Sequence, residues 1–221
     1  MMHKRINLLI FVALLILAGL YFVYSKINSA EQCAKAAGVW DEVEQTCERT
    51  LEQTIYENLA AGFPITMRYP ETNKPVILDK QEKIGGGFYL RGHYQDLLQA
   101  AADGKEAVYE RASLYLNISK MVLLTKAETG IIYFSAPFIV NTAGSGVYVY
   151  VGLFSYDLQS KNSQHLDSVF LGDRIREEKI TLFDNMIRVD FLAHSKEQAM
   201  ADYPNEPIEI YLQLVNLSAS S

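Results

Sequence analysis

The sequence predicts an α+β fold: a mainly antiparallel β domain with one or two helices in its N-terminal half, preceded by a single transmembrane helix. Three observations support this prediction. An apolar run extends from Leu8 to Tyr24. Leu51, Ile55 and Leu59 follow one another at helical spacing. Beyond residue 121, apolar and polar residues alternate in short segments, as side chains do along strands that bury one face.

The N-terminal run indicates a membrane anchor. Its seventeen residues are at the lower limit of what spans a hydrocarbon core of about 30 Å. Lys4 and Arg5 precede the run and would hold the start of the chain in the cytoplasm. We expect an uncleaved signal anchor in a bacterial inner membrane, with the C-terminal domain in the periplasm. The alternative is secretion to the periplasm after cleavage behind Ala30.

Length and charge limit the organisation. A chain of 221 residues suits one main domain with appendages. We divide it into a cytoplasmic stub and anchor (1–30), a disulfide clasp with a short helix (31–64) and a β-rich extracytoplasmic domain (65–221). Residues 31–221 carry a formal charge of −9, which argues against nucleic-acid binding.

Cys33 and Cys47 are the only cysteines and flank the only tryptophan, Trp40. We predict a disulfide that closes a loop of about 15 residues and stabilises it by ~3 kcal/mol. The alternative is a redox or metal pair, for which the CxxC spacing and a nearby histidine are missing.

The elements before residue 121 follow from local signals. Thr50 and Gln53 form a capping box for a helix over 51–59, and residues 65–69 alternate as a strand. The three glycines at 85–87 lack the lysine of a phosphate loop, so we interpret them as a flexible joint or bulge. We also expect a helix over 94–102 and a strand from Leu114.

The second half predicts a series of strands. Residues 121–124 and 131–134 form a hairpin, as do 180–183 and 187–191. Residues 147–154 are apolar on both faces and indicate a central strand covered on both sides. Residues 187–191 and 208–214 alternate and should each bury one face.

Residues 144–146 (Gly-Ser-Gly) run into an aromatic strand, followed by Phe-Leu-Gly-Asp-Arg-Ile at 170–175, a hairpin, Pro204 and a last strand. Over roughly residues 130–215 this order is similar to a poorly characterised bacterial envelope domain of secreted proteins and lipoproteins, including the actinobacterial LppP/LprE type. The resemblance brings no enzymatic activity with it. The acidic loop and the cysteine pair near the closing proline, both common in the family, are absent.

Within that motif, Gly172, Asp173 and Arg174 are a candidate structural or ligand motif. We expect the Asp173 carboxylate to cap a turn and Arg174 to pair with an acid across the sheet. The alternative is acid–base catalysis or ligand capture. His165 and Asp167 should share one face of a strand, where a metal could use them with a third ligand. No catalytic, cofactor or metal residue is assigned.

The predicted function is a non-catalytic binding or scaffold protein of the cell envelope, held by the inner membrane and acting through contacts with another envelope protein. An exposed sheet edge or the aromatic residues Tyr148, Tyr150, Phe154 and Tyr156 would make these contacts. Two alternatives remain open. One is an envelope hydrolase or metal- or ligand-binding protein with a site near His165, Asp167 and Asp173. The other is an inhibitor of a lysozyme-type hydrolase.

Overall fold

A computed structural model describes most of the chain after the N-terminal segment. The described residues are 29–33, 39–43, 46–62, 65–99, 106–124, 130–183 and 186–213. The chain divides into two compact units, Met1–Thr54 and Ile55–Ser221. Each unit is described by itself.

The first unit contains the disulfide. Residues 29–33 are helical, and β1 (Val39–Asp41) pairs antiparallel with β2 (Thr46–Glu48). Cys33 and Cys47 are bonded to each other, which confirms the predicted disulfide. The helix α2 (Leu51–Ala60) begins here and continues into the second unit. The backbone N–H of Gln53 donates to Thr50 Oγ1 at 3.1 Å, as expected of an N-cap.

The membrane prediction is not supported. In the part of the chain that the structure describes, no helix is long and apolar enough to cross a membrane. This finding contradicts the predicted single-pass anchor. It also contradicts the predicted inner-membrane location with a periplasmic domain. Residues 1–28 of the predicted segment lie outside the described residues.

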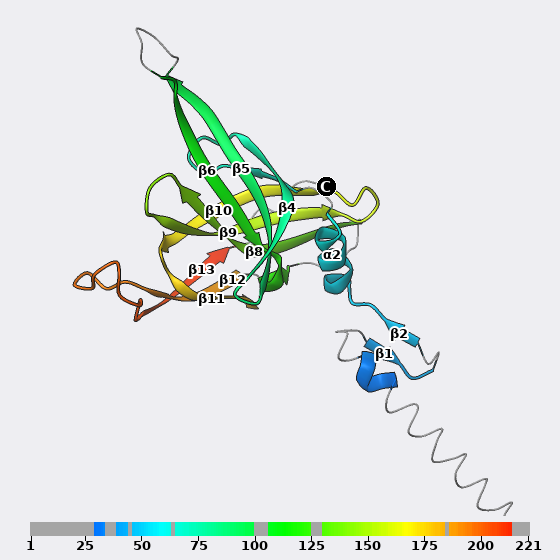
Figure 1. Ribbon diagram of the computed structural model, residues 1–221. Helices are drawn as coiled ribbons and strands as arrows, with labels where there is room; N and C mark the ends of the chain where they lie inside the picture. The colour runs from blue at the N-terminus through cyan, green and yellow to red at the C-terminus, as the bar shows by residue number, and fades with distance from the viewer. Residues whose placement is uncertain are drawn as a thin grey trace, which may run out of the picture. The chain divides into compact units, whose positions relative to one another are not determined.

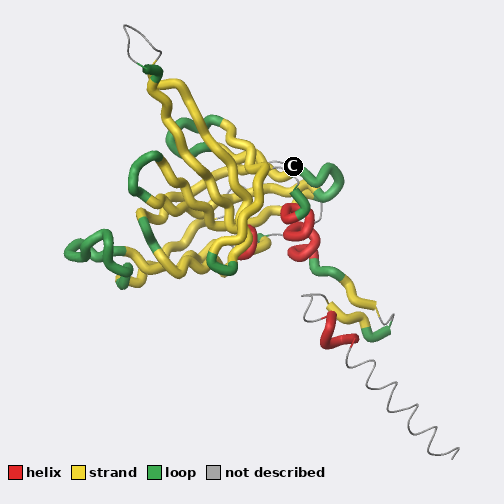
Figure 2. The backbone as a smooth tube through the Cα atoms, in the orientation of Figure 1, coloured by secondary structure: helices red, strands yellow, loops and turns green. Residues whose placement is uncertain are grey.

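The second unit consists of two sheets and little else (Figure 2). The larger sheet contains β3 (Ile65–Arg68), β4 (Pro75–Ile84), β5 (Gly87–Gln99), β6 (Val108–Asn117), β7 (Val122–Leu123), β8 (Ile131–Thr142), β9 (Val147–Asp157) and β10 (Ser163–Asp173). The smaller contains β11 (Arg176–Phe183), β12 (Met186–Ala193) and β13 (Glu206–Gln213). After α2, the one described helical turn is η1 (Ile118–Lys120). The predicted α+β class is therefore wrong, because strands make up almost all of this unit.

The larger sheet closes on itself as a barrel (Figure 1). Seven strands form the barrel, and β7 is added beside β8. Consecutive barrel strands pair antiparallel, and β6 pairs directly with β8. Because the number of strands is odd, the first and the last point the same way, and the closing pair β3–β10 is parallel. This seam is short, with only Ile65–Ser163 and Thr66–Gln164 in register.

Alternate residues of the barrel strands fill its interior. Facing positions on neighbouring strands interdigitate, and the large aromatic rings come from β8 and β9, where Phe134 stacks on Phe154 at 5.0 Å. Among the buried interior positions are Ile65, Met67, Val76, Leu78, Leu90, Leu114, Leu116, Ile132, Phe134, Phe138, Val140, Phe154 and Tyr156. Ile55 and Leu59 of α2 are also fully buried, as their spacing predicts.

The smaller sheet covers the outer face of β8 and β9. Val149 and Val151 point outward from the barrel and pack with Ile187, Val189 and Phe191 of β12 in a second core. The predicted central strand at 147–154, covered on both sides, is confirmed by this arrangement. So are the pairing of 180–183 with 187–191 and the buried face of the latter.

Two local predictions are corrected. The helix predicted over 94–102 is wrong over 94–99, because β5 continues to Gln99 and pairs with β6, with Tyr94 opposite Ala112. Residues 100–102 lie outside the described residues. Gly85 and Gly86 form neither a joint nor a bulge. They are the two central residues of the β4–β5 hairpin turn, with φ of +55° and +84°, which suits the mirror-image turns that hairpins prefer.

Candidate functional site

The seam between β3 and β10 is the most distinctive feature of the barrel wall. β10 carries a bulge between His165 and Asp167, so that His165 lies opposite Phe154 while Asp167 lies opposite Leu153. Neighbouring residues of β9 point to opposite faces, and so do their partners. His165 therefore points into the barrel and Asp167 outward, and the prediction that they share one face is wrong.

His165 bridges the seam where the backbone ladder ends. Its Nδ1 accepts a hydrogen bond from the backbone N–H of Arg68 at 3.1 Å. The ring lies between Phe138 and Phe154, with centroids at 5.7 and 5.1 Å, and only 6% of the residue is exposed. Because Nδ1 accepts, the proton of the neutral ring is on Nε2, which has no hydrogen-bond partner among the described residues.

Burial controls the protonation of this histidine. Loss of hydration lowers the pKa of His165 to about 4. The backbone and carboxylate of Asp167 raise it in part, and the charge of Arg68 lowers it further. The imidazole is thus neutral near pH 7 and serves as a hydrogen-bond acceptor between two strands.

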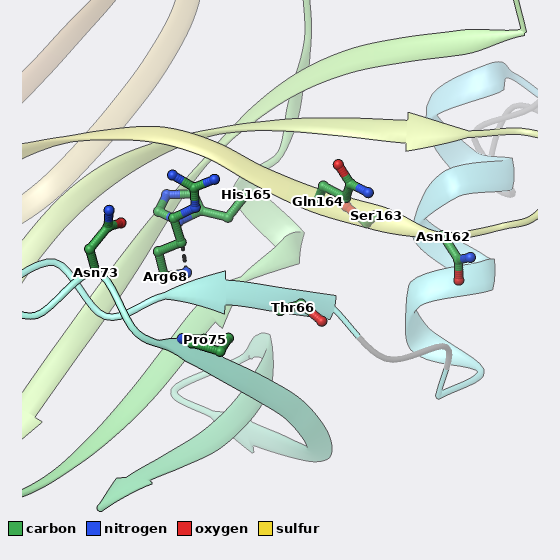
Figure 3. Close-up of a pocket in the computed structure, with 8 residues that line it drawn as sticks. All are labelled: Thr66, Arg68, Asn73, Pro75, Asn162, Ser163, Gln164 and His165. Atoms are coloured by element: carbon green, nitrogen blue, oxygen red, sulfur yellow. Dashed lines mark hydrogen bonds between the residues drawn. The ribbon is translucent and has the colours of Figure 1, made fainter. Parts of the chain in front are cut away.

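A hollow of about 480 Å³ lies over the seam (Figure 3). The side chain of Arg68 lies beside the ring of His165, and Asn73 faces them from the β3–β4 turn. The lining residues are Thr66, Arg68, Asn73, Pro75, Asn162, Ser163, Gln164 and His165. These described residues contribute amides, hydroxyls, one imidazole and one guanidinium, and no carboxylate.

A second hollow, also of about 480 Å³, adjoins the first and shares Arg68, Asn73 and His165 with it. It adds two carboxylates and two aromatic rings. The further lining residues are Pro70, Glu71, Tyr150, Leu166, Asp167, Ser168 and Phe170. We call the two hollows together the seam groove.

Aromatic rings form one wall of the second hollow. Phe170 is 53% exposed and packs against Tyr150, with centroids at 5.2 Å, and against Tyr148 at 6.3 Å. Burial raises the pKa of Tyr150, and the nearby charge of Glu71 adds to the effect. Phe170 thus keeps about half of its surface exposed in a hollow that Glu71 and Asp167 also line.

The Gly-Asp-Arg motif is hydrogen-bonded to the loop between β8 and β9. Asp173 Oδ1 accepts a hydrogen bond from the backbone N–H of Val147 at 2.7 Å, and the N–H of Arg174 donates to the Val147 carbonyl at 2.8 Å. The Arg174 guanidinium donates to the carbonyl of Ser145 at 2.5 Å and lies 3.5 Å from the Asp173 carboxylate. The motif therefore ties the β10–β11 connection to the β8–β9 loop. Arg174 pairs with its neighbour, not with an acid across the sheet.

The other predicted site residues do not converge. His165 and Asp167 point to opposite faces, and Asp173 is engaged with Val147. Within the described ranges, no group of three or more His, Cys, Asp or Glu residues is arranged to hold a metal ion. Of the four aromatic residues proposed as contacts, Phe154 and Tyr156 are fully buried, so only Tyr148 and Tyr150 are accessible.

Three groove residues were missed in the sequence: Arg68, Asn73 and Phe170. Arg68 has the pattern of an ordinary outward residue of an alternating strand, and Asn73 that of a turn residue. Nothing local indicates that they meet β10, because the barrel closure that brings them together joins distant segments. Comparison with protein-family models, curated proteins and solved structures found no match.

Proposed function

We propose that this protein is a non-catalytic binding protein and that the seam groove is its binding surface. The observation that supports this is the combination, in two adjoining hollows of about 480 Å³ each, of a guanidinium, amides, carboxylates and exposed aromatic rings. Binding sites for small molecules typically occupy roughly 300–1,000 Å³ and combine apolar walls with a few polar groups.

The chemistry of the groove favours binding over catalysis. The pKa of His165, lowered to about 4 by burial, makes the ring a weak base near pH 7. Its Nδ1 is also occupied by the N–H of Arg68. A serine–histidine contact does exist elsewhere, between Ser113 Oγ and His93 Nδ1 at 3.1 Å. These two residues face each other on neighbouring strands and line neither hollow of the groove.

The same surface narrows the contact region predicted from the aromatic residues. With Phe154 and Tyr156 inside the core, Tyr148 and Tyr150 remain accessible, and Phe170 packs against both. Phe170 is the most exposed of the three, and it belongs to the groove. A ligand in the groove and a contact through these rings would therefore use one surface.

A fragment screen by ligand-observed NMR on the full chain tests the proposal without assuming a ligand class. We expect the hits to compete for one site and to lose binding in the double variant Arg68→Ala, Asn73→Ala. The matched control is Arg176→Ala, Asn205→Ala, two exposed residues outside the groove. Hits that bind both variants equally, or an absence of any hit that shifts groove resonances, would overturn the proposal.

A further inference from the structure

The first hollow contains a cation available to an anionic ligand. Arg68 is exposed on β3, and its guanidinium forms no ion pair with a described residue. The described lining of this hollow contains no carboxylate, although residues 31–221 carry a net charge of −9. Guanidinium groups bind carboxylates and phosphates in a planar fork. A single arginine among neutral amides suits the single charge of a carboxylate better than the double charge of a phosphate.

The remaining polar groups of the first hollow are both donors and acceptors. Thr66 contributes a hydroxyl, and Asn73 and Gln164 contribute amides. A side-chain amide or hydroxyl can pair with a ligand hydroxyl in either direction. A ligand that presents several hydroxyl groups beside its carboxylate therefore matches this lining.

The second hollow is suited to a neutral, ring-shaped unit. The ring of Phe170, which packs against Tyr150 and belongs to a residue that is 53% exposed, offers apolar surface to the C–H groups of a sugar ring. Glu71 and Asp167 beside it can accept hydrogen bonds from hydroxyls. These two carboxylates outnumber the one guanidinium, that of Arg68, which the two hollows share, so the unit bound here should carry no negative charge of its own.

An extended peptide is the competing ligand, and the edge of β10 disfavours it. Beyond Gln164, β10 pairs with no described strand on the side of β3 and could pair with an added strand. Bulges interrupt the strand between His165 and Asp167 and again between Phe170 and Gly172. The carboxylate of Asp167 also accepts the N–H of Ser168 at 2.8 Å. Bulges and inserted charges are features that prevent edge pairing.

We propose that the seam groove binds an oligosaccharide in which an acidic sugar is joined to a neutral one. The carboxylate of the acidic sugar pairs with Arg68, and the neutral ring stacks on Phe170. This inference rests on the proposed function and names the ligand class of the same groove.

Titration calorimetry of the full chain with four probes tests it. The probes are a hyaluronan tetrasaccharide, in which acidic and neutral sugars alternate, a neutral chitotetraose, a fully acidic tetragalacturonate and a tetraglutamate peptide. We expect the hyaluronan tetrasaccharide to bind at least about tenfold more tightly than each of the others, a difference of about 1.4 kcal/mol. Equal or tighter binding of chitotetraose, tetragalacturonate or the peptide would overturn the inference.

Variants locate the binding. Arg68→Gln and Phe170→Ala should each weaken hyaluronan binding about tenfold or more. The matched controls Arg176→Gln and Phe183→Ala remove an exposed arginine and an exposed phenylalanine outside the groove, and should leave it unchanged. Glu71→Gln with Asp167→Asn should improve tetragalacturonate binding, because it removes the repulsion in the second hollow. Thermal unfolding establishes that each variant is folded.

The outcomes separate the two proposals. If fragments occupy the groove but no oligosaccharide binds, the ligand class is wrong and the binding function stands. If neither fragments nor oligosaccharides bind in an Arg68-dependent way, both are wrong. Hyaluronan binding that survives Arg68→Gln and Phe170→Ala would place the sugar elsewhere and overturn this inference.

Discussion

His165 and Arg68 are separated by 97 positions in the sequence and joined by one hydrogen bond, from the backbone N–H of Arg68 to the imidazole Nδ1. The bond lies just beyond the last ladder pair of the seam, Thr66 with Gln164. The ring thereby takes the place of a backbone carbonyl at the point where the bulge in β10 ends strand pairing. A side chain, not the backbone, thus continues the closure of the barrel.

The first prediction concerns pH and follows from the buried ring. The pKa of His165 is about 4 in the folded protein and about 6.5 in an unfolded chain. Between these values the unfolded state binds a proton that the folded state does not. The neutral ring of His165 therefore makes its full contribution to the free energy of unfolding above about pH 6.5. As the pH falls towards 4, up to about 3 kcal/mol of this contribution is lost.

Urea unfolding at about pH 7 and about pH 4.5 measures this loss. The variant His165→Asn keeps an acceptor near the position of Nδ1 but cannot take up the proton. We expect the free energy of unfolding of the wild type to fall more steeply than that of the variant, since carboxylates contribute to both. If the free energy of unfolding fell equally with pH in the wild type and the variant, His165 would not be the cause of the loss.

The second prediction concerns the hydrogen bonds that join Asp173 and Arg174 to the β8–β9 loop. Asp173→Ala leaves the N–H of Val147 without its acceptor, and we expect a loss of about 1–3 kcal/mol in the free energy of unfolding. Asp173→Asn keeps a carbonyl oxygen and should cost less. Asp79→Ala, which removes an exposed carboxylate on β4, is the control and should have little effect. If Asp173→Asn lowered the free energy of unfolding as much as Asp173→Ala, the result would argue against the capping role of Asp173.

The third prediction concerns packing inside the barrel at Gly92. A Cβ at this position would lie 2.5 Å from the carbonyl oxygen of Ile77 and 2.6 Å from Leu78 Cδ2. Because a backbone atom in the neighbouring strand cannot move aside cheaply, Gly92→Ala should destabilise the protein by about 1–3 kcal/mol or more. Gly144→Ala meets only Thr142 Oγ1 at 3.7 Å and should be nearly neutral. Thermal unfolding of the two variants compares them directly.

The fourth prediction concerns the disulfide of the first unit. Replacing both Cys33 and Cys47 with serine releases a closed loop of about 15 residues, which costs ~3 kcal/mol of loop stability in the chain-entropy view. Because the bond lies within Met1–Thr54, the loss should be confined to that unit. Hydrogen exchange should accelerate in β1 and β2 and stay unchanged in the barrel strands. Faster exchange in β8 and β9 would contradict this prediction.

Local patterns predicted those elements whose neighbours lie close in sequence. The alternation of Ile187, Val189 and Phe191 gave a half-buried strand, and Thr50 marked the start of α2. The helix predicted from Tyr94 failed because pairing with β6 overrides local preference: Leu97 lies opposite Tyr109 on a continuous ladder.

Features that depend on distant contacts left no local signal. The parallel closure of β3 on β10 follows only from the count of strands, and no short motif encodes it. The bulge beside Leu166 shifts Asp167 to the other face, which residue spacing alone does not reveal. Arg68 and Asn73 come close to β10 only when β3 pairs with it. The groove was therefore not predicted from the sequence.

The shortness of the closing pair also has a kinetic consequence. Loop closure over about a hundred residues is slow and is compensated only after the intervening hairpins have formed. The seam should therefore be the last part of the barrel to form and the first to open locally. The backbone amide of Arg68 should accordingly exchange its hydrogen faster than the amides of β8 and β9. A ligand that contacts Arg68 on β3 and Phe170 on β10 would link the two strands across the seam. Its binding energy would then appear as slower opening of the whole barrel.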